Sequence, residues 1–168
     1  FGDWSSDVCS SDLEVEFGGL GAVLQDCAGL GASADELELA SHLASERAAQ
    51  HADLVLWVHA ADTRWDTRET TAVERIGATR LILVVSKSDL TAVVAEPAPE
   101  LGFVAEVRLS APRGTGLQEL REVVSRELGA RMAARSGGPL VGDRSEERRV
   151  GKECRCRVAA CHETDINR

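Results

Sequence analysis

The chain has 168 residues, of which 43% are hydrophobic and 28% are charged, which is ordinary for a single globular domain. Its formal net charge of −9 argues against binding nucleic acid through a broad basic surface. No apolar run is long enough to span a bilayer, and no secretory signal is visible. The 5 cysteines stand at irregular spacing, which is a poor disulfide framework. We therefore expect a cytoplasmic protein.

The two ends of the chain do not read as protein sequence. Asp3–Leu13 and Arg144–Cys154 each match the in-frame translation of a sequencing adapter. The charged residues Glu146–Arg149 could otherwise be a solvated helical turn or a small basic patch. We expect residues 1–13 to be a non-native, adapter-like segment, residues 14–141 to be the domain, and residues 142–168 to be an adapter-like, disordered tail.

The domain opens with the pattern of a hairpin followed by a helix. Glu14–Phe17 alternates polar and apolar residues, Gly18 and Gly19 interrupt it, and Ala22–Leu24 resumes an apolar run. Ser33 with a glutamate three residues later forms a capping box, which predicts a helix ending near His51.

Strands and helices then alternate along the chain. Two continuous apolar runs have the character of strands buried on both faces, and a third strand and two helices complete the pattern. Such alternation indicates an α/β domain with a mostly parallel sheet flanked by helices. The predicted strands are Leu54–Val58, Leu81–Val85 and Phe103–Leu109, and the predicted helices are Thr67–Ile76, capped by Asp66, and Leu117–Met132.

In parallel sheets, ligands bind beyond the carboxyl ends of the strands. The first loop in such a position contains Asp26 and Gly29 in the pattern D-x-x-G. An aspartate there can hold Mg²⁺ through water, and a glycine lets a backbone N–H approach a phosphate closely. Alone, the pattern also fits an ordinary β-turn.

The second loop follows Leu81–Val85 and reads Ser86-Lys87-Ser88-Asp89. Guanine presents two N–H donors side by side, which one fixed carboxylate such as that of Asp89 can accept, whereas adenine lacks this donor pair. The aliphatic stem of Lys87 can cover the face of the base. A solvated turn with a capping aspartate would have the same sequence.

The third loop contains Ser110-Ala111, where a backbone N–H can donate to the guanine carbonyl. This dipeptide has little meaning alone. The three loops in this order, each directly after a predicted strand, together indicate a guanine-nucleotide site.

The same order of motifs resembles the G domain of translation-factor-type GTPases, a Ras-like P-loop NTPase fold, of the TrmE-Era-EngA-YihA-like class. Asp26-Cys-Ala-Gly-Leu-Gly, Asp35-Glu-Leu-Glu38 and Ala52-Asp-Leu-Val-Leu are similar in sequence and spacing to the tRNA-modification GTPase family MnmE (TrmE). The resemblance implies GTP or GDP and Mg²⁺ as ligands, with Asp26 at the metal, and Glu38 as the catalytic acid that orients water. Asp26, Gly29, Ser86, Lys87, Asp89, Ser110 and Ala111 are then the nucleotide-binding residues.

The family resemblance also implies partners: tRNA undergoing wobble-uridine modification, an MnmG-like flavoprotein, and a second copy bound through the G domain. The chain departs from the family in having Cys27 for threonine and Ser86 for asparagine. It also contains no G-x-x-x-x-G-K-[ST] motif, so we expect the first strand, the P-loop, the first helix and the K⁺-binding loop to be missing and the chain itself to be inactive. An Era/Der-type ribosome-assembly GTPase and a non-functional open reading frame remain alternatives.

Overall fold

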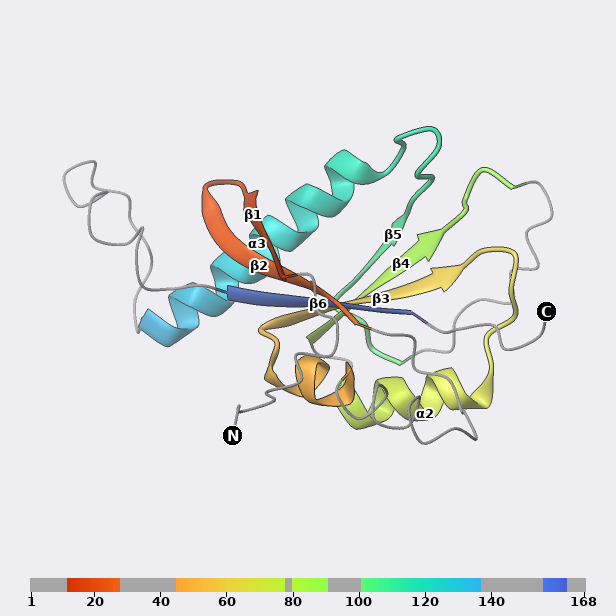
Figure 1. The fold of residues 1–168 in the computed structure, drawn as a ribbon, viewed down its shortest axis with the longest axis horizontal. Coiled ribbons are helices and arrows are strands. Elements are labelled where there is room, and N and C mark those ends of the chain that lie inside the picture. Colours follow the sequence, from red (N-terminus) through yellow and green to blue (C-terminus); the bar gives the residue numbers. More distant parts are fainter. Residues whose placement is uncertain (1–11, 28–44, 78–79, 91–100, 137–155, 163–168) are drawn as a thin grey trace, which may run out of the picture.

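The structure, a computed structural model, describes residues 12–27, 45–77, 80–90, 101–136 and 156–162. These residues form one six-stranded sheet with helices on both of its faces (Figure 1). The strand order across the sheet is β1-β2-β6-β3-β4-β5. The elements are β1 (Asp12–Phe17), β2 (Leu20–Asp26), β3 (Leu54–Ala60), α2 (Thr67–Ile76), β4 (Leu81–Ser86), β5 (Ala105–Arg108), α3 (Leu117–Ser136) and β6 (Cys156–His162), and residues 45–51 are also helical.

The sheet is parallel from β2 to β5, and only β1 runs antiparallel to its neighbour. The predicted mostly parallel α/β fold is therefore confirmed. The hairpin of β1 and β2 turns at Gly18 and Gly19, whose φ angles of 58° and 86° are the left-handed values that a two-residue hairpin turn requires. β1 begins at Asp12, so two residues that we assigned to the adapter-like segment, Asp12 and Leu13, form part of the sheet.

Residues of the central strands alternate between two hydrophobic cores. On one face, Val55, Trp57 and Leu83 pack with α2 and the helical residues 45–51. On the other face, Leu56 and Val84 pack with α3. Figure 1 shows α3 and α2 on opposite sides of the sheet. Burial on both faces explains why β3 and β4 are continuous apolar runs in the sequence.

The helices begin close to the predicted positions. Asp66 caps α2 in a full capping box, in which its side chain accepts from the backbone N–H of Glu69 and the Glu69 side chain accepts from the backbone N–H of Asp66. α3 extends beyond Met132 to Ser136. Among the described residues, no helix is both long and apolar enough to cross a membrane. The capping box predicted at Ser33 lies outside the described residues.

The expectation of a disordered tail is wrong for Cys156–His162, which forms β6 in the middle of the sheet. β6 pairs in parallel with β2 on one side and with β3 on the other, and these two strands do not pair with each other. Its Val158 and Ala159 are 0% and 1% exposed. A short apolar segment fits this position because both neighbouring strands have backbone N–H and C=O groups that need partners.

Asp53 anchors the start of β6. Its backbone N–H donates to the Arg157 carbonyl at 2.8 Å, and its carboxylate accepts from the Arg157 backbone N–H at 2.8 Å. The same carboxylate forms an ion pair with Arg135 of α3 at 2.7 Å. These contacts fix the register of β6 against β3.

Candidate functional site

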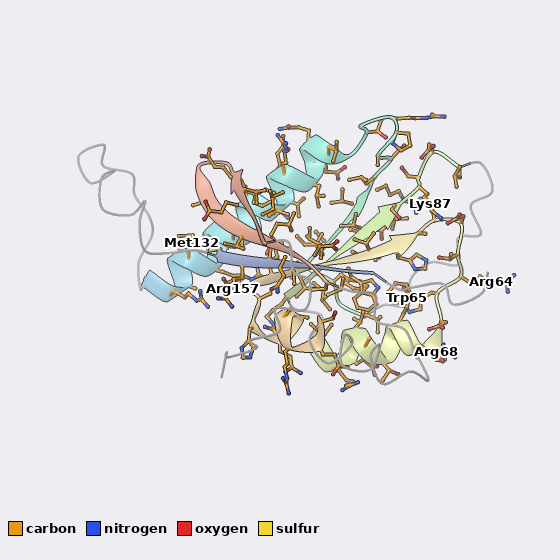
Figure 2. The ribbon with its side chains drawn as sticks, in the orientation of Figure 1. Arg64, Trp65, Arg68, Lys87, Met132 and Arg157 are labelled. Atoms are coloured by element: carbon orange, nitrogen blue, oxygen red, sulfur yellow. The ribbon has the colours of Figure 1, made fainter. Side chains whose placement is uncertain are left out.

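The predicted site loops meet at one edge of the sheet. Because β2, β3, β4 and β5 are parallel, their carboxyl ends lie on the same side. This edge holds Asp26 at the end of β2, the Ser86–Asp89 loop after β4, and Ser110-Ala111 after β5. Figure 2 shows Lys87 beyond the tip of β4, at the same end of the sheet as Trp65. Gly29 and Glu38 lie outside the described residues.

The Ser86–Asp89 loop has a fixed backbone. Lys87 adopts the left-handed region with φ 55°, which is unusual for a residue with a side chain. The backbone N–H of Leu90 donates to the Lys87 carbonyl at 3.1 Å, closing a tight turn. The backbone N–H of Ser88 donates to the Leu109 carbonyl at 3.1 Å, which ties this loop to the segment after β5. The turn therefore holds Asp89 in one position relative to Ser110.

Ser110 binds the carboxylate of Asp89 directly. Its hydroxyl donates to Asp89 Oδ1 at 2.7 Å, and the Ser110 residue itself is 0% exposed. This hydrogen bond is the main reason why the pKa of Asp89 lies below its usual value, so the carboxylate is ionised. The Ser110 backbone N–H already donates to the Thr115 carbonyl at 3.1 Å. Of the two backbone N–H groups in this dipeptide, that of Ala111 is therefore the one expected to donate to a ligand.

Lys87 forms an ion pair that its sequence context does not predict. Its Nζ lies 3.0 Å and 2.9 Å from the two carboxylate oxygens of Asp62, in the turn after β3. The hydrogen bond from Lys87 is the largest cause that lowers the pKa of Asp62. Because the ammonium group is held at Asp62, the aliphatic stem of Lys87 is steered along the edge of the sheet. Asp62 lies two residues after the end of β3, and its position in the sequence did not identify it as the partner of Lys87.

Ser86 links the ends of two strands, although the family pattern has asparagine at this position. Its hydroxyl donates to the His59 carbonyl at 3.2 Å, and its carbonyl accepts from the Ala61 backbone N–H at 2.9 Å. Ser86 thus holds the end of β4 to the end of β3. Its side chain reaches the backbone of the neighbouring strand rather than another ligand-binding loop.

The loop between Ser110 and α3 is compact. Ser110 and Thr115 form an isolated antiparallel bridge, and Gly114 N–H donates to the Ala111 carbonyl at 3.3 Å. Gly116 has φ 82°, and a Cβ atom there would collide with the carbonyl group of Arg108. Glycine at this position therefore allows the loop to fold back against β5 and present Ala111 at the sheet edge.

Below this edge, a buried carboxylate joins α2 to β3. Glu69 is 2% exposed, and its Oε1 accepts from Trp57 Nε1 at 3.3 Å and lies 2.9 Å from His59 Nδ1. Its Oε2 accepts from the Asp66 backbone N–H at 3.3 Å. The Trp65 ring stacks at a tilt on His59, with 5.1 Å between ring centroids. This cluster sets the end of β3, from which Asp62 reaches Lys87.

Asp26 is exposed at the end of β2 and offers carboxylate oxygens at the sheet edge. Within the described residues, no group of three or more His, Cys, Asp or Glu side chains gathers to hold a metal ion. Mg²⁺ commonly binds through one or two carboxylates together with phosphate and water oxygens. A single carboxylate is therefore compatible with Mg²⁺ that arrives with a nucleotide, and it is not a preformed metal cage.

Curated relatives of this sequence share one description, tRNA modification GTPase MnmE. The protein from Moorella thermoacetica is 34% identical over 152 residues, which is 87% of this chain and 33% of the relative. A Synechococcus protein is 34% identical over 70% of the chain and 25% of its own length, and one from Burkholderia lata is 35% identical over 73% of the chain and 27% of its length. The chain thus spans about a third or less of these relatives. No family model matches the chain, and no solved structure is significantly similar to it.

Proposed function

The chain is an MnmE-like G-domain fragment, and on this premise we propose that the carboxyl edge of its sheet binds the base of a guanine nucleotide. The observation that carries the proposal is the bond from the buried Ser110 hydroxyl to Asp89, which holds an ionised carboxylate beside the backbone N–H of Ala111. A carboxylate acceptor and a backbone donor on neighbouring loops are the two kinds of group that the edge of guanine needs.

In this proposal Asp89 accepts hydrogen bonds from the two adjacent N–H groups of guanine. An ionised carboxylate has about four lone-pair positions, so the bond from Ser110 leaves acceptor capacity for the base. The backbone N–H of Ala111 donates to the guanine carbonyl. Adenine has an amino group where guanine has that carbonyl and lacks the adjacent donor pair. It would leave the Ala111 N–H and the remaining acceptor positions of Asp89 without partners on the base.

The remaining nucleotide contacts follow from the same premise. Asp26 would hold Mg²⁺ through its carboxylate, Gly29 would approach the terminal phosphate, and the stem of Lys87 would cover the base. Bound Mg²⁺ would neutralise charge on the phosphates. Glu38 would orient the attacking water. We propose that the parent protein hydrolyses GTP and acts in tRNA modification, as the description of its relatives suggests. The resemblance of its motifs to the MnmE family extends this proposal to wobble uridine and an MnmG-like flavoprotein partner.

The base-binding proposal is tested by NMR titration of the ¹⁵N-labelled chain with GDP and with ADP. We expect GDP, and not ADP, to shift the amide signals of Ala111 and Asp89, with a dissociation constant in the millimolar range because phosphate contacts are few. Asp89→Ala should abolish the response. Glu106→Ala, which removes an exposed carboxylate from the neighbouring strand β5, should keep it. Equal responses to GDP and ADP would refute the proposal.

Hydrolysis by the 168-residue chain alone is not expected. Most of the phosphate-binding energy in P-loop enzymes comes from a glycine-rich loop, and G-x-x-x-x-G-K-[ST] does not occur in this sequence. Phosphate release from GTP with Mg²⁺ should therefore equal the buffer background. Turnover above that background, abolished by Glu38→Ala, would contradict this statement and support Glu38 as the catalytic acid.

A further inference from the structure

Two buried cysteines meet where β2 and β6 end. Asp26 pairs with Ala160 in the register of these strands, so the next residues, Cys27 and Cys161, stand opposite each other. The backbone N–H of Cys27 donates to the Ala160 carbonyl at 2.9 Å, which continues the pairing past the end of β2. Cys27 is 4% exposed and Cys161 is 0% exposed. Their backbones are therefore held as neighbours.

The two side chains share one face of the sheet. Both lie in the hydrophobic core that contains Trp57, whereas Cys156 lies in the other core, with α3. Neighbouring strands are about 4.7–4.9 Å apart, which falls within the roughly 4.4–6.8 Å between Cα atoms that disulfides require. Among the cysteines that the structure describes, this pair has the geometry for a bond.

The two thiols differ in their access to solvent. Cys27 is 4% exposed at the end of its strand pairing, whereas Cys161 is 0% exposed. The thiolate is the form of cysteine that reacts with oxidants. Cys27 also follows the exposed Asp26 at the rim of the sheet. A small, uncharged oxidant would therefore reach and oxidise Cys27 before Cys161.

We propose that Cys27 and Cys161 form a peroxide-sensitive thiol pair that closes to a disulfide. In the first step, the Cys27 thiolate attacks one oxygen of hydrogen peroxide, the O–O bond breaks, and the products after protonation are a sulfenic acid and water. In the second step, the sulfur of Cys161 displaces the hydroxyl group from Cys27, and its proton leaves with that group as a second water. The two thiols lose two electrons in total, and one peroxide molecule accepts them.

The disulfide would link β6 covalently to the end of β2, next to Asp26. This link would add to the backbone pairing and to the contacts of Asp53, which already hold β6 in the sheet. The size of the oxidant matters because both sulfurs are buried. Hydrogen peroxide is close to water in size, whereas oxidised glutathione is a large charged peptide, so the folded chain should react faster with peroxide.

The test uses the full chain, reduced, exposed to hydrogen peroxide, alkylated and digested for mass spectrometry. The expected product joins the Cys27 and Cys161 peptides and lacks two hydrogens. Cys156→Ser, the matched control from the opposite face of β6, should form it to the same extent. Cys161→Ser should stop Cys27 at the sulfenic acid, and labelling of Cys27 by dimedone should rise several-fold.

The same peroxide treatment in concentrated urea shows which disulfides the unfolded chain forms by chance. In the unfolded chain, disulfides should form between many different pairs of the 5 cysteines. A folded chain that gave the same spread, or that gave Cys27 sulfinic acid without a cross-link, would overturn the proposal. An absence of any reaction at Cys27 in the folded chain would overturn it as well.

Discussion

Replacing Glu69 by alanine should destabilise the domain strongly. The Glu69 side chain accepts hydrogen bonds from several buried donors, and water cannot reach those donors to take its place. The change leaves the Trp57 indole N–H, in a residue that is 0% exposed, without its acceptor, at a cost of about 1–3 kcal/mol. It also removes half of the capping box at Asp66, where a lost cap costs typically about 1 kcal/mol. The expected total is roughly 2–4 kcal/mol, out of about 5–15 kcal/mol for a typical domain.

The assay is urea unfolding of the full chain, followed by circular dichroism and tryptophan fluorescence. The midpoint should fall while the dependence on urea concentration stays constant. Glu69→Gln keeps the side-chain length and one carbonyl acceptor, so it should lose less than Glu69→Ala. Glu74→Ala removes an exposed glutamate from the same helix and should cost less than about 0.5 kcal/mol. If Glu69→Ala and Glu74→Ala shifted the midpoint equally, the assignment of Glu69 as the link between α2 and β3 would be wrong.

Three further predictions follow from the site and the sheet. The pKa of Asp62 should lie below its ordinary value, and ¹³C titration should show it return to that value in Lys87→Met. The ion pair of Asp62 with Lys87 therefore stabilises the fold above the ordinary pKa of aspartate, and this stabilisation is lost as the pH falls through the lowered pKa. The effect on the free energy of unfolding should be small because the pair is exposed. Gly116→Ala should cost roughly 1–3 kcal/mol in urea unfolding, more than Gly102→Ala, because both glycines have positive φ and only Gly116 faces the Arg108 carbonyl. Backbone amides of Val158–Cys161 should exchange with deuterium as slowly as those of β3, and exchange at the rate of an unfolded chain would contradict the place of β6.

Much of the fold could be predicted from the sequence, because burial of apolar runs and capping of helices depend on residues close together in the chain. β3 and β4 are apolar runs since both faces are covered, and α2 begins after Asp66 since that residue caps it. β6 could not be predicted, because seven residues with Arg157 among small side chains have no strong strand signal. Its place depends on two strands far away in the sequence, β2 and β3, whose facing sides do not pair with each other.

In the site, too, features set by the local sequence could be predicted, and features set by contacts between distant residues could not. Asp26, the Ser86–Asp89 loop and Ser110-Ala111 were recognisable because each follows a strand, and the parallel sheet brings them to one edge. The partners of these residues were not recognisable. That Asp62 pairs with Lys87, and that the Ser110 hydroxyl orients Asp89, depends on turns whose backbone geometry has no signature in the sequence.

The most direct test of the central claim is to exchange the base that Asp89 selects. Xanthine differs from guanine in having a carbonyl where guanine has its amino group, and an asparagine side chain offers an N–H donor to that carbonyl. Affinities of the wild-type chain and of Asp89→Asn for GDP and for xanthosine diphosphate should be measured by the same NMR titration. We predict that the wild type prefers GDP and that Asp89→Asn prefers xanthosine diphosphate. If the substitution left the preference unchanged, Asp89 would not be the residue that reads the base.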